Sequence, residues 1–190
     1  AIKAASDDSR HAFSVFKPSG LSLQGLLSKS ADKFTVKEEE EWERVLGRIR
    51  TICSSTADAG GRVLIDAEES WIQDNIDEIA EDMMSDYNRE TAVVFTTVQL
   101  YRHDRLQYLK DIGNRAKEGG FKVGVKLVRG AYMEKERERA EKLGYPSPIQ
   151  PNKEATDRDY DDAIKYCLDN LDVFHIFVGT HNSESTLLLC

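Results

Sequence analysis

The sequence predicts an α/β protein in which helices alternate with parallel strands. Short apolar runs alternate along the chain with longer segments whose apolar residues recur at helical spacing. The predicted strands that end at Asp66, Gln99 and Arg129 follow one another at about the length of one βα unit. Nearly continuous apolar strands are typical of a parallel sheet that helices cover. A βα barrel and an open, doubly wound sheet both fit this pattern.

The five predicted strands are short apolar runs that end at turn or polar residues. The first ends at Lys17-Pro18-Ser19-Gly20, which reads as a loop, and the second ends at the acidic run Asp66-Ala67-Glu68-Glu69. In chain order the strands cover residues 13–16, 63–65, 92–98, 121–128 and 173–178.

The predicted helices are indicated by caps and by apolar spacing. Thr35 and Glu38 have the spacing of a capping box, and Gly60-Gly61 ends the helix that they open, because glycine accepts the left-handed geometry of a helix end. Gly119-Gly120 closes a later helix in the same way. The other predicted helices cover 72–87, 106–116, 133–143 and 157–171, and we expect the charges of the segment 133–143 to be solvated.

The composition is that of an ordinary globular domain. With 190 residues, the chain is long enough to form one domain over residues 1–190 with a sizeable core. Its net charge of −8 and its isoelectric point near 5.1 argue against nucleic acid and against an anionic membrane surface as partners. No apolar run reaches the length of a membrane-spanning helix.

The three cysteines, Cys53, Cys167 and Cys190, lie far apart in the sequence and show no zinc-type spacing. We expect reduced thiols, as in a cytosolic-type compartment, rather than a disulfide framework. The chain begins at Ala1 without an initiator methionine or a cleavable apolar leader, which is typical of a cut or processed terminus.

Polar residues recur at the carboxyl end of every predicted strand: Lys17, Asp66, Gln99, Arg129 and Thr180-His181-Asn182. In a barrel, all five positions converge on one face, where barrel enzymes keep their active sites. In an open sheet, only neighbouring strand ends meet at a switch point. Polar residues that could bind or react with a ligand stand at all the predicted strand ends, and this favours the barrel.

Each of these residues alone has a simpler structural interpretation. Lys17 reads as a solvated loop cation, and Asp66 reads as the N-cap of the next helix. Gln99 reads as a partner of loop carbonyls, and His181 as a hydrogen-bonded core histidine. No histidine has metal-ligand spacing to another ligating residue, so we expect no metal site. The functional interpretation therefore rests on the set.

The heptad Lys126–Tyr132 resembles the signature strand and turn of proline dehydrogenases. Segments 64–68, 98–101 and 180–182 match the same family, and the resemblance runs from about Phe13 to the end of the chain. It implies a distorted (βα)8 barrel of the TIM type that holds FAD. It also implies oxidation of L-proline to Δ1-pyrroline-5-carboxylate, the first step of proline catabolism.

The resemblance also implies roles for residues at the strand ends. Asp66 and Lys126 match active-site residues of the family, and Lys126 is expected near the flavin N5 atom. Lys17 matches the lysine that contacts the substrate carboxylate, and we expect it to pair with Asp66. Tyr132 is expected to pack against the flavin and the proline pocket. The residues expected to contact FAD are Ala67, Gln99, Val128, Arg129, Gly130, Ala131, Thr180 and His181.

Within that FAD-binding set, three residues have specific expected roles. Gln99 is expected to hydrogen-bond the flavin ring and so to tune its electron affinity. Arg129 stands where some relatives carry lysine, and we expect it to reach the FAD phosphates. Gly130 is expected to let the backbone approach the cofactor closely.

The resemblance further implies that the barrel is incomplete at its C-terminal end. Family members clamp the carboxylate of proline with two arginines that follow two further strands, and the sequence stops at Cys190 before such a segment. We expect these 190 residues alone to self-associate through open sheet edges or to stay partly molten, and to oxidise proline negligibly. Two alternatives remain open: a Schiff-base lyase or aldolase that uses Lys126 or Lys17, and a catalytically inert fragment of the dehydrogenase.

The expected partners follow from the same resemblance. They are L-proline as the substrate and a quinone or another electron acceptor. Membrane contact is expected only through the quinone, and only peripherally. The expected compartment is the cytoplasm of a bacterium, including the surface of its inner membrane, or the mitochondrion of a eukaryote.

Overall fold

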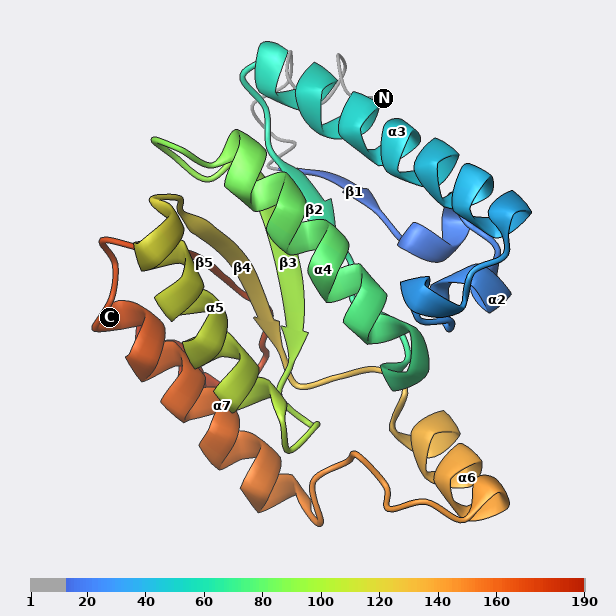
Figure 1. The fold of residues 1–190 in the computed structure, drawn as a ribbon. Coiled ribbons are helices and arrows are strands. Elements are labelled where there is room, and N and C mark those ends of the chain that lie inside the picture. The colour runs from blue at the N-terminus through green and yellow to red at the C-terminus, as the bar shows by residue number, and fades with distance from the viewer. Residues whose placement is uncertain (1–12, 190) are drawn as a thin grey trace. The chain divides into compact units, whose positions relative to one another are not determined.

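The computed structural model describes residues 13–189 and has an α/β fold (Figure 1). Two short 3-10 turns, Pro18–Gly20 and Ala31–Lys33, precede the first long helix. The chain divides into two compact units, with the boundary between Thr96 and Thr97. The strands are β1 (Ser14–Phe16), β2 (Val63–Ile65), β3 (Val94–Gln99), β4 (Val123–Val128) and β5 (Phe174–Val178). The helices are α2 (Gln24–Leu27), α3 (Val36–Asp58), α4 (Ser70–Tyr87), α5 (Arg105–Gly119), α6 (Met133–Leu143), α7 (Lys153–Leu168) and α8 (Ser183–Leu187).

The strands of the first unit run parallel to one another. β1 pairs with β2 from Ser14 opposite Val63 to Phe16 opposite Ile65, and β2 pairs with the first residues of β3. All residues of β2 are buried, because a parallel strand carries apolar side chains on both faces. The predicted parallel pairing of successive strands is therefore confirmed in this unit.

The long helix α3 belongs to the first unit (Figure 1). Thr35 accepts a hydrogen bond from the Glu38 N–H, and the Glu38 side chain accepts one from the Thr35 N–H at 2.8 Å. The predicted capping box is therefore confirmed. The buried stripe of α3 consists of Val45, Ile49 and Cys53 at helical spacing, together with Thr56. Both α3 and α2 pack against α4.

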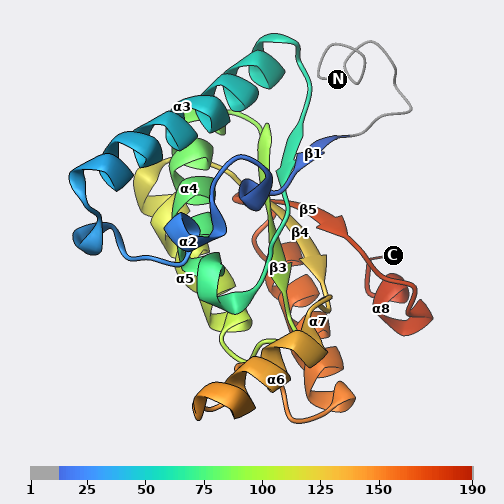
Figure 2. The same cartoon turned by 90° about the vertical axis from the view of Figure 1, so that its right-hand side faces the viewer.

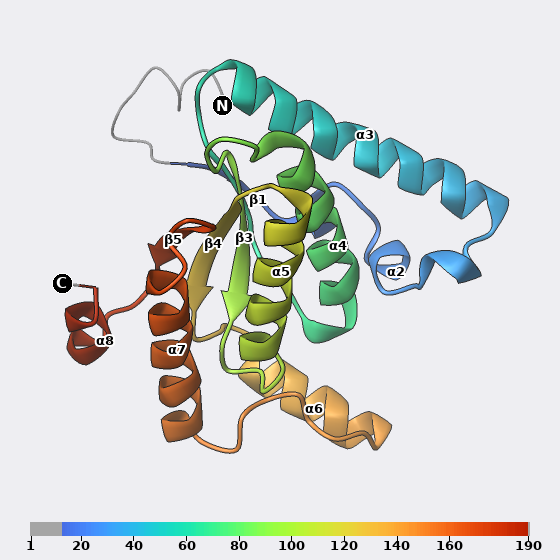
Figure 3. The same ribbon diagram turned by 60° about the vertical axis from the view of Figure 1, so that its left-hand side comes forward.

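The strands of the second unit are also parallel. β4 pairs with β5 along most of its length, with Val123 opposite Phe174. The chain that leaves β3 runs alongside the end of β4, since the Leu100 N–H donates to the Val128 carbonyl at 2.9 Å. The helices α5 and α7 lie side by side and both contact β4 (Figure 3). Figure 2 shows α8 just beyond the end of β5.

Two helices of the second unit differ from the sequence prediction. α7 begins at Lys153 rather than at residue 157, because the Asn152 side chain caps it by accepting a hydrogen bond from the first turn at 2.8 Å. The same helix ends at Leu168 rather than at residue 171. α6 has the predicted bounds, but the expectation that its charges are solvated is wrong for Glu136, which is fully buried.

The other boundaries agree more closely with the prediction. Every predicted strand is present, and its ends lie within about two residues of the observed ones. The predicted loop after the first strand is a 3-10 turn. The sequence pattern does not indicate α2 or α8, because an element of four or five residues is too short to show helical periodicity.

Cys53 and Cys167 are buried free thiols. Burial raises the pKa of each to about 12, so both remain protonated and unreactive at neutral pH. The expectation of a reducing, cytosolic-type compartment stays a prediction. Ala1 and Cys190 lie outside the described residues.

Each unit contains parallel strands with helices packed on them, which is the architecture expected of part of a βα barrel. No helix between residues 13 and 189 is both long and apolar enough to cross a membrane.

Candidate functional site

The site residues predicted from the sequence fall into two clusters, one in each unit. In the first unit, Lys17 directly follows β1 and Asp66 directly follows β2. The two strand ends are held together, because the Asp66 N–H donates to the Phe16 carbonyl at 3.0 Å. Lys17 Nζ lies 3.4 Å from Asp66 Oδ2, and the Lys17 side chain is 48% exposed. The expected Lys17–Asp66 pair is therefore confirmed.

The simpler interpretation of Asp66 as a helix cap is wrong. α4 begins at Ser70, and Glu69 occupies its N-cap position. Asp66 lies too far before the helix to cap it, and its carboxylate faces Lys17 instead. A carboxylate paired with a half-exposed ammonium group is suited to orient that cation towards a ligand. The adjacent Ala67 is buried.

In the second unit, Gln99 is tied to the turn that follows β4. Its side chain is 4% exposed, and Gln99 Oε1 accepts a hydrogen bond from the Ala131 N–H at 3.2 Å. This contact of Oε1 is with a loop N–H, and the interpretation of Gln99 as a partner of loop carbonyls stays a prediction. Gln99 therefore fixes the backbone at Ala131, in the turn that follows β4.

The turn itself requires a glycine at position 130. Gly130 has φ +141°, a conformation that side chains with a Cβ rarely adopt. A Cβ atom there would also clash with the ring of Tyr101, which lies directly against the glycine. Burial, and secondarily the Glu136 carboxylate, raises the pKa of Tyr101, so this phenol stays neutral at physiological pH. The group that lies close to Gly130 is therefore the Tyr101 ring, and the expected approach of this backbone to a cofactor stays a prediction.

Arg129 is surrounded by protein groups from two further segments. Its Nε lies 2.5 Å from Asp157 Oδ1, and its terminal nitrogens donate to Thr180 Oγ1 at 2.8 Å and to Ser185 Oγ at 3.1 Å. The guanidinium carbon lies 4.2 Å from the centre of the Tyr160 ring, in cation–π geometry. Arg129 therefore ties the end of β4 to α7 and to the segment that enters α8.

The charge of Asp157 is stabilised within this cluster. Burial alone would raise its pKa, but hydrogen bonds from Lys153 and Arg129 outweigh burial and hold the pKa below its usual value. Asp157 therefore stays ionised beside Arg129 at physiological pH. The sequence-based reasoning did not identify Asp157, Tyr160 or Ser185, because nothing in their local pattern reveals a contact with a residue far away in the chain.

The remaining predicted residues of the second unit differ in exposure. Lys126 and Val128 are half-buried, and they alternate with the buried Val125 and Leu127, so the two pairs face opposite sides of the sheet. His181 is exposed, which rules out the simpler interpretation as a core histidine. Tyr132 is half-buried at the N-cap of α6, and Ala131 and Gly130 are exposed.

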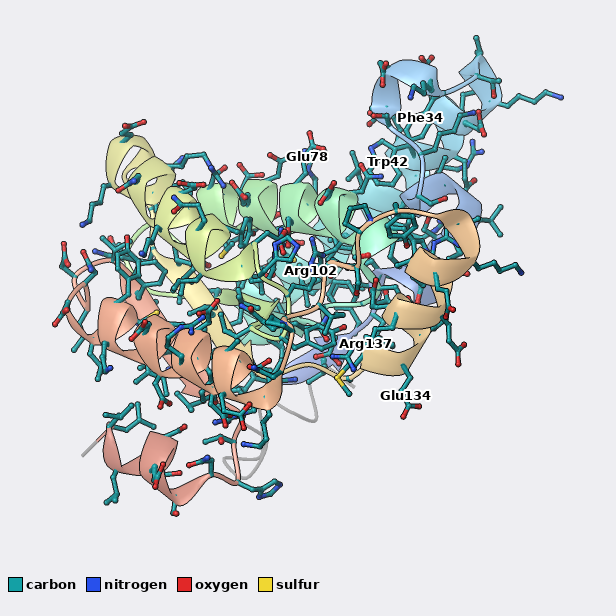
Figure 4. All side chains as sticks on the ribbon, turned by 90° about the horizontal axis from the view of Figure 1, so that it is seen from below. Phe34, Trp42, Glu78, Arg102, Glu134 and Arg137 are labelled. Atoms are coloured by element: carbon teal, nitrogen blue, oxygen red, sulfur yellow. The ribbon has the colours of Figure 1, made fainter. Side chains whose placement is uncertain are left out.

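A cavity of about 440 Å³ adjoins the turn that follows β4, and its lining is mostly apolar but includes the cationic residues Arg129, Arg137 and Lys153. The N-terminus of α7 contributes to its wall, and helix N-termini favour anions. In Figure 4, Glu134 points away from α6, whereas Arg137 of the same helix turns inward. Arg137 donates a hydrogen bond to the Gln150 carbonyl at 3.4 Å. Residues of the lining include Tyr101, Arg129, Arg137, Ile149, Asn152 and Lys153.

The described residues contain no cluster of side chains that could bind a metal ion. Among residues 13–189, no three histidine, cysteine or acidic side chains lie together in an arrangement that could hold a metal ion. The two clusters contain ammonium, guanidinium, carboxylate and amide groups. Such groups bind carboxylates and phosphates and orient them.

Comparison with known proteins gives a consistent result. A family model described as proline dehydrogenase matches residues 1–190. Proline dehydrogenase 1, mitochondrial, of Drosophila melanogaster is 35% identical over 171 residues, which cover 85% of this chain and 25% of the relative. The carbapenem antibiotics biosynthesis protein CarD of Pectobacterium carotovorum subsp. carotovorum is 34% identical over 179 residues, covering 93% of this chain and 46% of the relative. The chain thus spans between a quarter and about half of the length of these two relatives.

Solved structures of proline utilization A share the fold. The protein from Bdellovibrio bacteriovorus inactivated by N-propargylglycine superimposes with a TM-score of 0.80 at 22% identity, covering 92% of this chain and 18% of that chain. A variant of the Bradyrhizobium japonicum protein superimposes with a TM-score of 0.81 at 17% identity, covering 99% of this chain and 20% of that chain. At these identities the likeness concerns the fold alone. The predicted α/β class of the barrel type is confirmed.

Proposed function

The chain belongs to the proline dehydrogenase family, and on that premise we propose that it is part of an enzyme that oxidises L-proline to Δ1-pyrroline-5-carboxylate with FAD as the hydride acceptor. The observation that carries the proposal is the Lys17–Asp66 pair at two adjacent strand ends, which suits the carboxylate of an amino acid. The family match gives no support to a Schiff-base lyase or aldolase. The whole of residues 1–190 is proposed to form part of one FAD-binding barrel domain.

The substrate-binding part of the proposal assigns one task to each residue. Lys17 donates charge-assisted hydrogen bonds to the proline carboxylate, and Asp66 holds the ammonium group in position. Tyr132 contributes a wall of the proline pocket. Lys126 supplies positive charge beside the reacting centre, where it favours electron-rich species. These residues orient the substrate and exclude water, which is the protein's task in a hydride transfer.

When FAD is bound, its flavin ring is the electron acceptor of the reaction. The cavity beside the turn that follows β4 is proposed to take its diphosphate, because Arg129, Arg137 and Lys153 are among the lining residues and the cavity adjoins the N-terminus of a long helix. Tyr101 fills the space beside Gly130, and the buried Gln99 side chain holds the Ala131 N–H, so the turn next to this cavity is fixed in shape. The residues proposed to hold FAD are Ala67, Gln99, Val128, Arg129, Gly130, Ala131, Thr180 and His181.

Three further proposals concern the surroundings of the reaction. The electrons are proposed to pass to a quinone or another acceptor, with peripheral contact to a membrane only through the quinone. The relative from Drosophila melanogaster is named as mitochondrial, which supports a mitochondrial location if this protein is eukaryotic. If the protein is bacterial, the proposed location is the cytoplasm, including the surface of the inner membrane. The 190 residues alone are proposed to self-associate through their open sheet edges.

The cofactor proposal predicts that the full-length protein binds FAD. The apoprotein titrated with FAD is expected to develop a bound-flavin absorption band in the blue, with saturable quenching of flavin fluorescence. Lys153→Met is expected to weaken FAD binding roughly two- to fivefold, because an exposed charge pair is worth at most about 1 kcal/mol. Lys165→Met is the matched control, since Lys165 lies in the same helix but pairs with Asp162. A colourless protein without affinity for FAD would contradict the proposal.

A further inference from the structure

The turn that follows Lys17 is fastened to the second strand end at two points. The Ser19 N–H donates to Glu68 Oε1 at 2.9 Å, and the Ser19 hydroxyl donates to Glu68 Oε2. Glu68 lies two residues after Asp66, and it is only 4% exposed. A buried carboxylate is costly unless it is hydrogen-bonded, so this arrangement compensates its burial in part and fixes Ser19 at the same time.

Glu68 is itself anchored to the helix behind it. The Glu68 N–H donates to Gln73 Oε1 at 2.9 Å, and Gln73 Nε2 donates to Asp77 Oδ1 at 2.8 Å. Gln73 and Asp77 belong to α4 and are 2% and 6% exposed. Buried hydrogen-bond chains of this kind rigidify the groups they join. The turn after Lys17 is therefore connected through Ser19 and Glu68 to the body of α4.

The ion pair of Lys17 is a weaker restraint than this connection. The distance of 3.4 Å between Lys17 Nζ and Asp66 Oδ2 is longer than the usual 2.7–2.9 Å of a charge-assisted hydrogen bond. Half-exposed ion pairs contribute little, because water screens them. The backbone of Lys17 is instead fixed on one side by strand pairing at Phe16 and on the other by the 3-10 turn, in which the Gly20 N–H donates to the Lys17 carbonyl at 2.9 Å.

We infer that Ser19 and Glu68 are positioning residues for Lys17. They hold the turn after Lys17 against the strand end that carries Asp66, so that the ammonium group meets the substrate carboxylate at a fixed distance. This inference rests on the proposed function, because it takes Lys17 as the residue that binds the carboxylate of proline. Neither residue touches the substrate in this account, and both act through Lys17.

Removal of the Ser19 hydroxyl is expected to weaken proline binding without slowing turnover at saturation. Ser19→Ala keeps the N–H bond to Glu68 but loses the second attachment point, so the turn gains freedom. Small displacements of a positioning group have large kinetic consequences. In the full-length protein, KM for L-proline is expected to rise about three- to tenfold with kcat within about twofold. Ser19→Thr, which keeps a hydroxyl, is expected to restore the original KM.

A double-mutant cycle tests whether Ser19 acts through Lys17. Steady-state kinetics are measured for Ser19→Ala, Lys17→Ala and the double variant, with bound flavin and melting temperature recorded for each. Ser19→Ala is expected to raise KM in the original background and to have no further effect when Lys17 is already absent. Ser22→Ala is the control, because Ser22 lies in the same segment between β1 and α2 and its hydroxyl bonds only the Leu23 carbonyl among the described residues.

The outcomes separate this inference from the proposed function. An equal rise in KM in both backgrounds, or no rise in either, would overturn the positioning role while leaving proline oxidation intact. A fall in melting temperature without a change in KM would likewise assign Ser19 a purely structural role. If the unaltered protein shows no proline-dependent turnover, or if Lys17→Ala leaves KM unchanged, the proposed role of Lys17 fails and the inference fails with it.

Discussion

Gly130→Ala is expected to destabilise the protein by about 3 kcal/mol or more, the largest stability effect that the structure predicts for a single methyl group. Two costs combine at this position. The backbone has φ +141°, and holding a residue with a Cβ in such a conformation costs about 1–3 kcal/mol. The new Cβ would also clash with the buried ring of Tyr101, and overpacking of this kind costs about 1–3 kcal/mol.

The measurement is thermal or urea-induced unfolding of the full-length protein, followed by circular dichroism. Gly47→Ala is the matched control, because Gly47 lies in the middle of α3 with open space around the position of a Cβ. Alanine is favoured over glycine in a helix by about 1 kcal/mol, so this control is expected to be neutral or stabilising. A Gly130→Ala variant as stable as the control would show that the turn does not have the described geometry.

Lys17→Ala is expected to lower kcat/KM for L-proline by about 10- to 100-fold while the protein keeps its flavin. The reason is the loss of a charge-assisted hydrogen bond to the substrate carboxylate, worth about 1.5–3 kcal/mol. The variant is expected to fold, because the Lys17 side chain is 48% exposed and its ion pair contributes little to stability. The measurement is a proline-dependent dye-reduction assay on protein of known flavin content.

Asp66→Asn provides the companion to that variant. Asparagine keeps the size and hydrogen-bonding ability of the side chain but removes the charge that faces Lys17. Asp66→Asn is expected to lower kcat/KM for L-proline, as Lys17→Ala does. It is not expected to lower stability through loss of a helix cap, since Glu69 occupies the N-cap position of α4. Unchanged proline kinetics in both variants would reject the carboxylate-binding role of the first cluster.

The sequence predicts the helices and strands that have a cap, an apolar run or an apolar spacing of their own. The capping box at Thr35 and the spacing of Val45, Ile49 and Cys53 predict α3, and the apolar runs predict all five strands. The pair of Lys17 and Asp66, which lie 49 residues apart in the chain, is expected from the family resemblance and not from local patterning.

What the sequence does not predict depends on contacts between distant residues. Glu136 lies in a highly charged helix, so only the packing of that helix reveals that its carboxylate is buried. The partners of Arg129 are 28 to 56 residues away in the chain, and the bond between Ser19 and Glu68 spans 49 residues. Periodicity and motif spacing carry no information about such pairs, because a hydrogen bond between distant residues leaves no trace in local patterning.

The most direct test of the account is the anaerobic addition of L-proline to the purified, FAD-loaded full-length protein. The account predicts loss of the visible flavin band, with one equivalent of Δ1-pyrroline-5-carboxylate formed per flavin reduced. The band is expected to return on addition of a quinone. A flavin spectrum that stays unchanged at high proline concentration would contradict the central claim, that this chain is part of a proline-oxidising flavoenzyme.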